Sequence, residues 1–488
     1  MVGVVQARWG AEAFPAANPF LPYPPFPKKV WRVWEPFLKR FPFEIHGEAT
    51  PLSPHPGGIP IQQIHRKITS LARQGLFAIL ASTVANKVIA FAANVLVVRI
   101  LSKTDYGVYS YSYSIISFFL LLNGLGIVNT VLQYGSEARE QAGRLEIYRF
   151  GLLFGGAATA ILCLTGLLFS FFFPFAMEGS AGIFRMLCFL PLLLFIHEYF
   201  STLLRCEGAN TRYALCLNLN SVCLLAFSAL GARLYGLAGY IGGLYLAYAV
   251  STALTLLFWL KGLVRPVSAA ASVANPRRRE FIRYALVCCG SNSANQLTLV
   301  LSSFLVGSML TDPAVMAGYK VAATIPTNCY FIAQSIIVFI YPYFARHNRD
   351  LRWIQRKSAL LIGSNALLNL VIGGLLILLA YPVIKLLYGS QYADAVPLFQ
   401  VLTLSFVIGA CLRTPCGNIL SMLRRVKLNL GITCATGVLN IILLPLLIRR
   451  CGVMGAAWAT LIATAAGGLL FFAALFYLLW IKKETVKE

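Results

Sequence analysis

The sequence predicts an all-α integral membrane protein with about twelve transmembrane helices, and three observations predict it. Of the 488 residues, 58% are hydrophobic and only 12% are charged, about half the charged share that is usual in soluble proteins. Apolar runs of roughly 20 residues, the length that crosses a bilayer, recur between residues 76 and 481. The runs do not alternate as barrel strands do, so helices that satisfy their own backbone hydrogen bonds are expected.

The expected helices follow one another along the chain with short polar connections. Their centres lie near Phe91, Phe119, Ile161, Leu193, Leu224, Tyr248, Val300, Tyr330, Leu370, Ser405, Ile442 and Leu469. With the helices numbered in order, about 25 Lys and Arg side chains fall on one side of the membrane and about 7 on the other. This positive-inside bias predicts that both termini are cytoplasmic. It also accounts for most of the net charge of +24, so no nucleic-acid partner is expected.

Composition divides the chain into five expected segments. Residues 1–65 are a cytoplasmic Pro- and aromatic-rich segment, expected to be a disordered tail or an upstream start-site extension. The alternative is an interfacial anchor, since WRVWEPFLKRF places Trp and Phe among cations. Two lobes of six helices each are expected at 66–262 and 282–481, with a cytoplasmic linker at 263–281 and a cytoplasmic tail at 482–488.

A short internal sequence repeat supports the prediction of two lobes. VLQYGSEAR, residues 131–139, and VFIYPYFAR, residues 338–346, share Val, Tyr, Ala and Arg at the end of the second helix of each half. Because six is even, both halves enter the membrane in the same sense. The sequence therefore predicts a parallel repeat about a pseudo-twofold axis along the membrane normal.

A few cations and many neutral polar residues interrupt the apolar runs. A Lys or Arg at a helix centre costs roughly 2.5–3.5 kcal/mol on insertion scales, so it needs a partner, a wet cavity or a function. Such cations are Lys87, Lys320 and Arg413. The residues expected to line the same cavity, on helices one, two, seven and eight, are Asn86, Asn94, Ser110, Ser114, Asn292, Asn295, Gln296, Thr324 and Asn328. The alternative for each hydroxyl or amide is a hydrogen bond across a helix contact, at about 0.6 kcal/mol.

Signs of catalysis are lacking in the sequence. The one acidic residue deep in an expected helix is Glu198, beside His197, and this pair is a candidate for ion coupling; a neutral or paired glutamate is the alternative. There is no Walker motif and no paired-carboxylate loop, and the five histidines do not cluster with Cys at metal-ligand spacing. We therefore expect neither enzymatic activity nor a cofactor or metal.

Three stretches carry a family resemblance. NKVIAFAANVLVVRILSKTDYGVYSYSYSI, the following GLGIVNTVLQYGSE, and LLRCEGANTRYALCLNLNSV resemble the Wzx-type polysaccharide flippases of the multidrug/oligosaccharidyl-lipid/polysaccharide (MOP) exporter superfamily. The resemblance covers residue 64 to the C-terminus. It implies a V-shaped, MATE-like pair of six-helix lobes around a cavity lined by helices one, two, seven and eight, in a bacterial cytoplasmic membrane.

The resemblance also implies a cargo. The family's usual cargo is an oligosaccharide linked to undecaprenyl diphosphate, moved to the periplasmic leaflet by alternating access for O-antigen, capsule or exopolysaccharide synthesis. Membrane lipid and polysaccharide polymerase machinery are the further expected partners. Lys87, Lys320 and Arg413 would then bind the diphosphate, since its charge must be offset on the way through hydrocarbon. The alternatives are a cation-coupled multidrug exporter of the same superfamily and, less favoured, a membrane polysaccharide polymerase or ligase.

Overall fold

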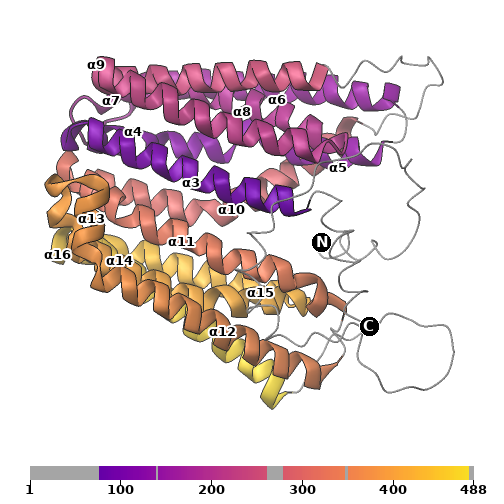
Figure 1. Cartoon of the computed structure of the whole chain (residues 1–488), viewed down its shortest axis with the longest axis vertical. Helices are drawn as coiled ribbons and strands as arrows, with labels where there is room; N and C mark the ends of the chain where they lie inside the picture. The colour runs from indigo at the N-terminus through magenta and orange to yellow at the C-terminus, as the bar shows by residue number, and fades with distance from the viewer. Residues whose placement is uncertain (1–75, 139–140, 261–277, 347–349, 483–488) are drawn as a thin grey trace, which may run out of the picture. The chain divides into compact units, whose positions relative to one another are not determined.

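The computed structural model describes residues 76–138, 141–260, 278–346 and 350–482, and every element in these ranges is a helix (Figure 1). The first half holds α3 (Leu76–Ile100), α4 (Lys103–Leu121), η1 (Asn123–Gly126), α5 (Ile127–Glu137), α6 (Gln141–Phe172), α7 (Ser180–Leu187), α8 (Leu190–Cys206) and α9 (Asn210–Leu260). The second half holds α10 (Arg278–Met309), α11 (Pro313–Arg346), α12 (Leu351–Leu378), α13 (Ala380–Tyr388), η2 (Ser390–Ala395), α14 (Val396–Ile408), η3 (Gly409–Arg413), α15 (Thr414–Met422), α16 (Val426–Phe476) and η4 (Tyr477–Ile481). The expected segment 1–65, the linker up to residue 277 and the tail from residue 483 lie outside the described residues.

The chain is a multi-pass membrane protein by helix length and hydropathy. Within the described ranges, eight segments are long and apolar enough to cross a membrane. They are Ser82–Ile100, Lys103–Glu137, Gly143–Phe172, Ser180–Cys206, Asn210–Leu260, Leu351–Leu378, Ser390–Met422 and Lys427–Ile481. The prediction of an all-helical membrane protein is confirmed at this level.

Two of these segments, α9 and α16, are helical hairpins. Each reverses at a glycine with almost the same backbone angles: Gly236 has φ 59° and ψ −138°, and Gly452 has φ 58° and ψ −141°. Glycine adopts a positive φ without steric cost. The two arms of each hairpin approach closely: a Cβ atom on Gly231 would lie 2.1 Å from the carbonyl oxygen of Gly239, and one on Gly455 would lie 2.0 Å from that of Leu447. Each 51-residue helix therefore supplies two antiparallel arms.

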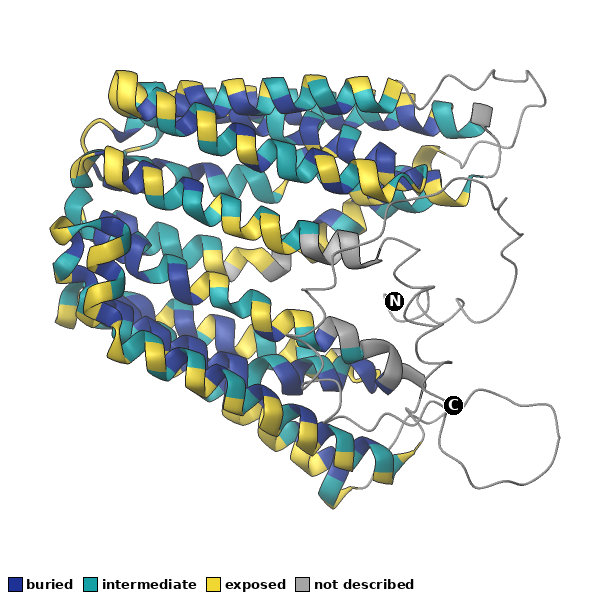
Figure 2. Ribbon diagram, viewed as in Figure 1, coloured by how far each residue is buried: buried dark blue, intermediate teal, exposed yellow. Residues whose placement is uncertain are grey.

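The outer helices carry apolar side chains outward and polar ones inward. Figure 2 shows this division by burial along α12. Its buried positions include Ser358, Asn365 and Asn369, whereas most exposed positions in its second half are large and apolar: Leu367, Leu370, Val371, Leu375 and Leu378. In lipid, polar groups must be satisfied within the protein, and outward leucines meet hydrocarbon. The pattern is that of a membrane helix.

The helices form two groups in Figure 1, and α10 packs against both. Phe304 of α10 meets Phe118 of α4 with ring centroids 5.4 Å apart, and Tyr134 of α5 meets Phe281 at 5.5 Å. On the other side, Ser302 of α10 donates a hydrogen bond of 3.1 Å to Asn440 of α16. Although α10 follows the expected linker in sequence, it therefore also packs along the first group.

Helix two, expected as one continuous span, is broken in its middle by η1. Gly124, Leu125 and Gly126 all have positive φ, at 61°, 46° and 77°. The polar groups freed by the break have partners: the Gly124 N–H donates to the Thr159 hydroxyl at 3.1 Å, and the Ser293 hydroxyl of α10 donates to the Leu121 carbonyl at 2.7 Å. Broken helices in membranes need such partners. A Cβ on Gly126 would lie 2.2 Å from the Ala285 carbonyl oxygen, so α5 and α10 are in backbone contact here.

Helix ends meet at two opposite ends of the bundle. We call one the Lys103 end, which holds the α3–α4 turn, the start of α11, and α13; the other is the Arg346 end, which holds the end of α5, the α8–α9 turn and the end of α11. At the Arg346 end, Glu207 accepts a hydrogen bond from Trp259 Nε1 at 3.1 Å. Burial raises the pKa of Glu207 above the usual value for glutamate, opposed by the Trp259 hydrogen bond and by the charges of Arg144 and Arg212.

Candidate functional site

The predicted residues of α3 divide between a packed face and an exposed one. Asn86 Nδ2 donates to the Leu217 carbonyl at 2.8 Å and to the Ser221 hydroxyl at 2.7 Å, so it joins α3 to α9. Lys87, the next residue, is exposed, and no hydrogen bond or ion pair joins its ammonium to another described residue. Asn94 lies two turns further on the Lys87 side of the helix, and its buried Oδ1 has no hydrogen-bond partner in the described structure.

The serines of α4 are buried. Ser110 and Ser114 are 4% and 2% exposed, and Ser114 donates to the Tyr111 carbonyl of its own helix at 2.6 Å. Tyr106, one turn before Ser110 on the same helix, is also buried. The structure thus places both serines inside the helix bundle. The expected place of Asn94, Ser110 and Ser114 on a cavity wall stays a prediction.

The predicted polar face of α11 is exposed along part of its length. Lys320, Thr324 and Asn328 follow one another at four-residue spacing and share a face; the first two are half-buried and Asn328 is exposed. Thr324 donates to the Lys320 carbonyl at 2.7 Å, and Asn328 to the Thr324 carbonyl at 2.9 Å. The Lys320 ammonium makes no hydrogen bond or ion pair with any described residue. Within the described part of the chain, this cation is therefore available to an anion.

On α10, Asn292 and Gln296 are exposed, whereas the side chain of Asn295 lies outside the described part of the chain. Both exposed amides lie on a helix long enough to span a bilayer. Amides in that position need water, another helix or a ligand as hydrogen-bond partner, because hydrocarbon offers none.

Arg413 ends a π-helical turn, η3, that precedes Pro415. The Thr414 N–H donates to the Gly409 carbonyl, and Pro415 has no N–H, so the Ala410 carbonyl loses its helical partner. Asn365 of α12 replaces that partner: its Nδ2 donates to the Ala410 carbonyl at 2.6 Å, and Asn369 in turn donates to Asn365. Asn365 and Asn369 are buried. This pair, which the sequence analysis did not single out, therefore holds the turn that carries Arg413.

The candidate coupling pair of α8 separates in the structure. His197 is buried, with Nδ1 3.4 Å from the Ser251 hydroxyl, which donates to Asn220 at 2.9 Å. Its Nε2 has no hydrogen-bond partner among the described residues. Glu198 is exposed, so the two side chains do not share a site. His197 with Ser251 and Asn220 forms a buried polar cluster, and no described group of His, Cys, Asp and Glu in this structure could hold a metal ion.

Three comparisons with known proteins bear on this arrangement. Residues 72–348, more than half of the chain, match the family model "Polysaccharide biosynthesis protein". The chain belongs to this family. The family prediction is confirmed, and a search of curated proteins gave no significant match.

Solved structures similar to this polysaccharide biosynthesis protein share its fold. "Lipid II flippase MurJ, inward closed conformation" superposes with a TM-score of 0.65 at 12% identity, covering 82% of this chain and 87% of the other. An inward-facing multidrug resistance MATE transporter of the MOP superfamily gives 0.66 at 15% identity, covering 82% and 96%. An outward-facing MATE transporter of the superfamily gives 0.51 at 12% identity, covering 83% and 94%. The family member thus has the MATE- and MurJ-like fold that its sequence predicts.

Proposed function

We propose that this protein is a flippase that moves a polyprenyl-diphosphate-linked oligosaccharide across the bacterial cytoplasmic membrane for export polysaccharide synthesis. The observation that carries the proposal is the Lys320 ammonium, which is half-buried on the polar face of α11 and has no partner among the described residues. Asn328 is exposed on the same face, and Lys87 and Gln296 are exposed on α3 and α10. Cationic and amide side chains are costly against lipid. We infer that they face a water-filled route.

The chemistry of the cargo fits that route. A diphosphate is anionic and a sugar carries many hydroxyls, so both lose hydration free energy in hydrocarbon unless the protein replaces water. Lys320, Lys87 and Arg413 would offset the diphosphate charge, since hydrogen bonds between ionised groups are the strong ones. The exposed amides of Asn292, Gln296 and Asn328 would exchange hydrogen bonds with sugar. The polyprenyl tail would stay in the bilayer. The buried Ser110 and Ser114 would form hydrogen bonds with the sugar only if α4 moves.

The proposal includes the predicted twelve spans in two lobes, 66–262 and 282–481. Support comes from matching features of the halves. The turns at Gly236 and Gly452 have nearly equal angles. The arms before and after each turn form one antiparallel pair in each half. A parallel repeat would place these pairs in equivalent positions.

The structure would represent the state open toward the cytoplasm. The positive-inside bias assigns the Arg346 end to the cytoplasm and the Lys103 end to the periplasm. The higher TM-score for the inward-facing MATE transporter, 0.66 against 0.51 for the outward-facing transporter, supports the same state. Cargo would then enter from the Arg346 end and leave at the Lys103 end. The buried His197 cluster is a candidate for coupling that movement to an ion.

Reconstitution tests the proposal. A fluorescent polyprenyl-diphosphate disaccharide would be placed in proteoliposomes, and its exposure to a membrane-impermeant quencher followed with and without the protein. We expect the protein to accelerate exchange between leaflets, and the Lys87→Ala, Lys320→Met and Arg413→Gln variants to slow it. Ion-driven efflux of a cationic dye, with no exchange of the glycolipid, would identify a multidrug exporter instead.

A further inference from the structure

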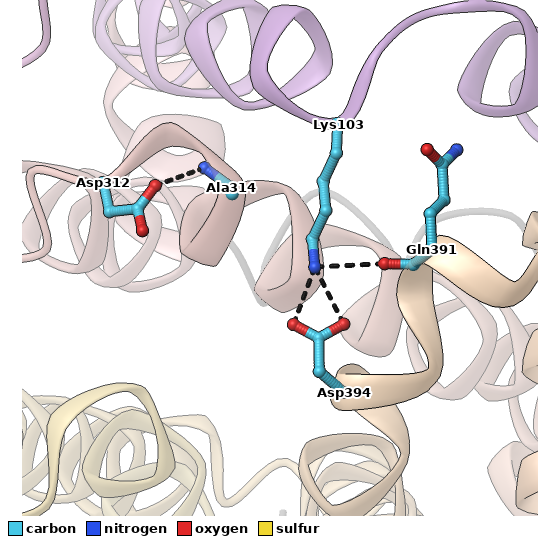
Figure 3. Close-up of polar contacts among 5 residues, drawn as sticks. All are labelled: Lys103, Asp312, Ala314, Gln391 and Asp394. Atoms are coloured by element: carbon cyan, nitrogen blue, oxygen red, sulfur yellow. Dashed lines mark hydrogen bonds and ion pairs between the residues drawn. The ribbon is translucent and has the colours of Figure 1, made fainter.

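One ion pair joins the two helix groups at the Lys103 end (Figure 3). Lys103 Nζ, at the start of α4, lies 2.8 Å and 2.6 Å from the two carboxylate oxygens of Asp394 in η2, and it also donates to the Gln391 carbonyl at 3.1 Å. The Lys103 side chain is only 21% exposed and that of Asp394 is 64% exposed. Because one ammonium contacts both carboxylate oxygens and a carbonyl, three acceptors fix its position.

Arg99 makes a second connection between the same elements. Its Nε donates to the Leu387 carbonyl at 2.8 Å, and its Nη2 donates to the Leu386 carbonyl. These carbonyls belong to the last turn of α13, whose end has no further helical N–H donors and carries the negative end of the helix dipole. Arg99 therefore caps α13, a helix of the second group, from the end of α3 in the first.

The local sequence fixes Arg99 and Lys103 relative to each other. Only Leu101 and Ser102 separate α3 from α4. The Ser102 hydroxyl accepts a hydrogen bond from the Asp105 N–H at 3.0 Å and donates to the Asp105 carboxylate at 2.7 Å. This N-cap holds Lys103 at the first position of α4. The two cations thus act from one short, capped turn.

Beneath these polar contacts the two groups share an apolar core. Tyr106 of α4, Tyr388 at the end of α13 and Tyr392 of η2 are buried in one hydrophobic cluster. A Cβ on Gly107 would lie 1.8 Å from the Pro313 carbonyl oxygen, so the backbones of α4 and α11 also touch at this end. Opening this end would require breaking the polar contacts and exposing Tyr388 and Tyr392.

We propose that Arg99, Lys103, Asp394 and the Leu386 and Leu387 carbonyls of α13 form a lock that holds the Lys103 end closed and must open for cargo to leave there. The role as an exit lock rests on the proposed function. Asp312, the acid that begins α11 at the same end, is not part of it: Figure 3 shows its carboxylate on the Ala314 N–H, at 2.8 Å, rather than on Lys103. Asp312 therefore offers a matched control.

Hydroxyl-radical labelling of the native tyrosines tests the lock in the full chain in lipid nanodiscs. Tyr388 and Tyr392 are 1% and 0% exposed, so mass spectrometry of their oxidation reports opening. Asp394→Asn keeps the size and removes the charge. We expect oxidation of both tyrosines to rise about two- to fivefold, the range for loss of a partly exposed ion pair. Asp312→Asn, which keeps a capping oxygen, should leave oxidation unchanged.

Charge reversal provides the second arm. Lys103→Asp should raise oxidation as Asp394→Asn does, and the double variant K103D/D394K should restore protection. Protection equal to wild type in both single variants would overturn the lock, as would equal effects of Asp394→Asn and Asp312→Asn. The fluorescent glycolipid assay separates this result from the proposed function: tyrosines that respond as expected in a protein that moves no probe would refute the function and keep the lock.

Discussion

Replacing Lys320 by methionine should separate cargo binding from stability. The Lys320 ammonium has no described anionic partner, so its removal leaves no buried carboxylate unpaired. A half-buried charge on a membrane-length helix instead costs free energy, and methionine of similar length removes that cost. We therefore expect the melting temperature of the purified protein to stay equal or to rise. A mutation that only damaged packing would lower it.

Transport should change in the opposite direction. A hydrogen bond to a charged group contributes about 1.5–3 kcal/mol, so losing one raises the half-saturating glycolipid concentration roughly 10- to 150-fold. Lys320→Arg should retain part of the affinity, since it keeps the charge. The measurement is initial leaflet exchange of the fluorescent glycolipid in proteoliposomes over a range of probe concentrations.

A matched cation serves as the control for Lys320. Lys385 of α13 is exposed, and its ammonium lies 5.6 Å from the centre of the Tyr381 ring at the Lys103 end. Lys385→Gln removes the same charge away from the polar face of α11 and should leave the half-saturating concentration unchanged. An unchanged concentration in Lys320→Met, or an equal rise in both variants, would refute the assignment of Lys320 to the diphosphate.

Three further predictions concern the fold and its charges. Gly126→Ala should destabilise the protein by about 1–3 kcal/mol, because the new Cβ collides with the backbone of Ala285. Gly182→Ala should not, because no atom lies within 4 Å of the added Cβ. Thermal unfolding of both variants in detergent is the measurement. Asn365→Leu should lower glycolipid affinity as Arg413→Gln does, while Asn365→Gln should restore part of it; glycolipid titrations of the three variants decide. Because the pKa of Glu207 is raised in the folded state, the contribution of this group to stability is fully present below its unfolded-state pKa and is lost as pH rises through its folded-state pKa. Glu207→Gln should flatten that part of the pH dependence of the melting temperature.

Which residues of one helix share a face could be predicted from the sequence, but contacts between helices could not. The polar face of α11 is an example of success: the four-residue spacing of Lys320, Thr324 and Asn328 fixes a shared face in any helix. Asn86 and Ser110 show the limit. Their helices were predicted, yet whether an amide or hydroxyl meets water, another helix or its own backbone depends on which helix lies opposite.

Two interruptions of the helices have signals in the sequence. The glycines at 124 and 126 in the middle of an apolar run permit the positive φ values that break helix two. Pro415 removes one N–H and so leaves a carbonyl in need of a donor. Each signal marks a place where the backbone needs help. Neither signal identifies the hydrogen-bond partner, because Thr159 and Asn365 are distant in sequence and are brought near only by packing.

The few cations at the Lys103 end differ in what they contact. Of the about seven Lys and Arg residues predicted on that side, Arg99 and Lys103 contact the second helix group. Arg185 lies over the Phe171 ring at 4.6 Å and Lys385 over Tyr381. Positive charge on this side opposes the predicted orientation of the chain. A cation on this side therefore needs a local contact that offsets its effect on orientation. For Arg99 and Lys103, that contact is the one that joins the two helix groups. If the lock is correct, removing the charge of Lys385 should leave the oxidation of Tyr392 unchanged, although it alters the net charge of that side as much as Lys103→Gln does.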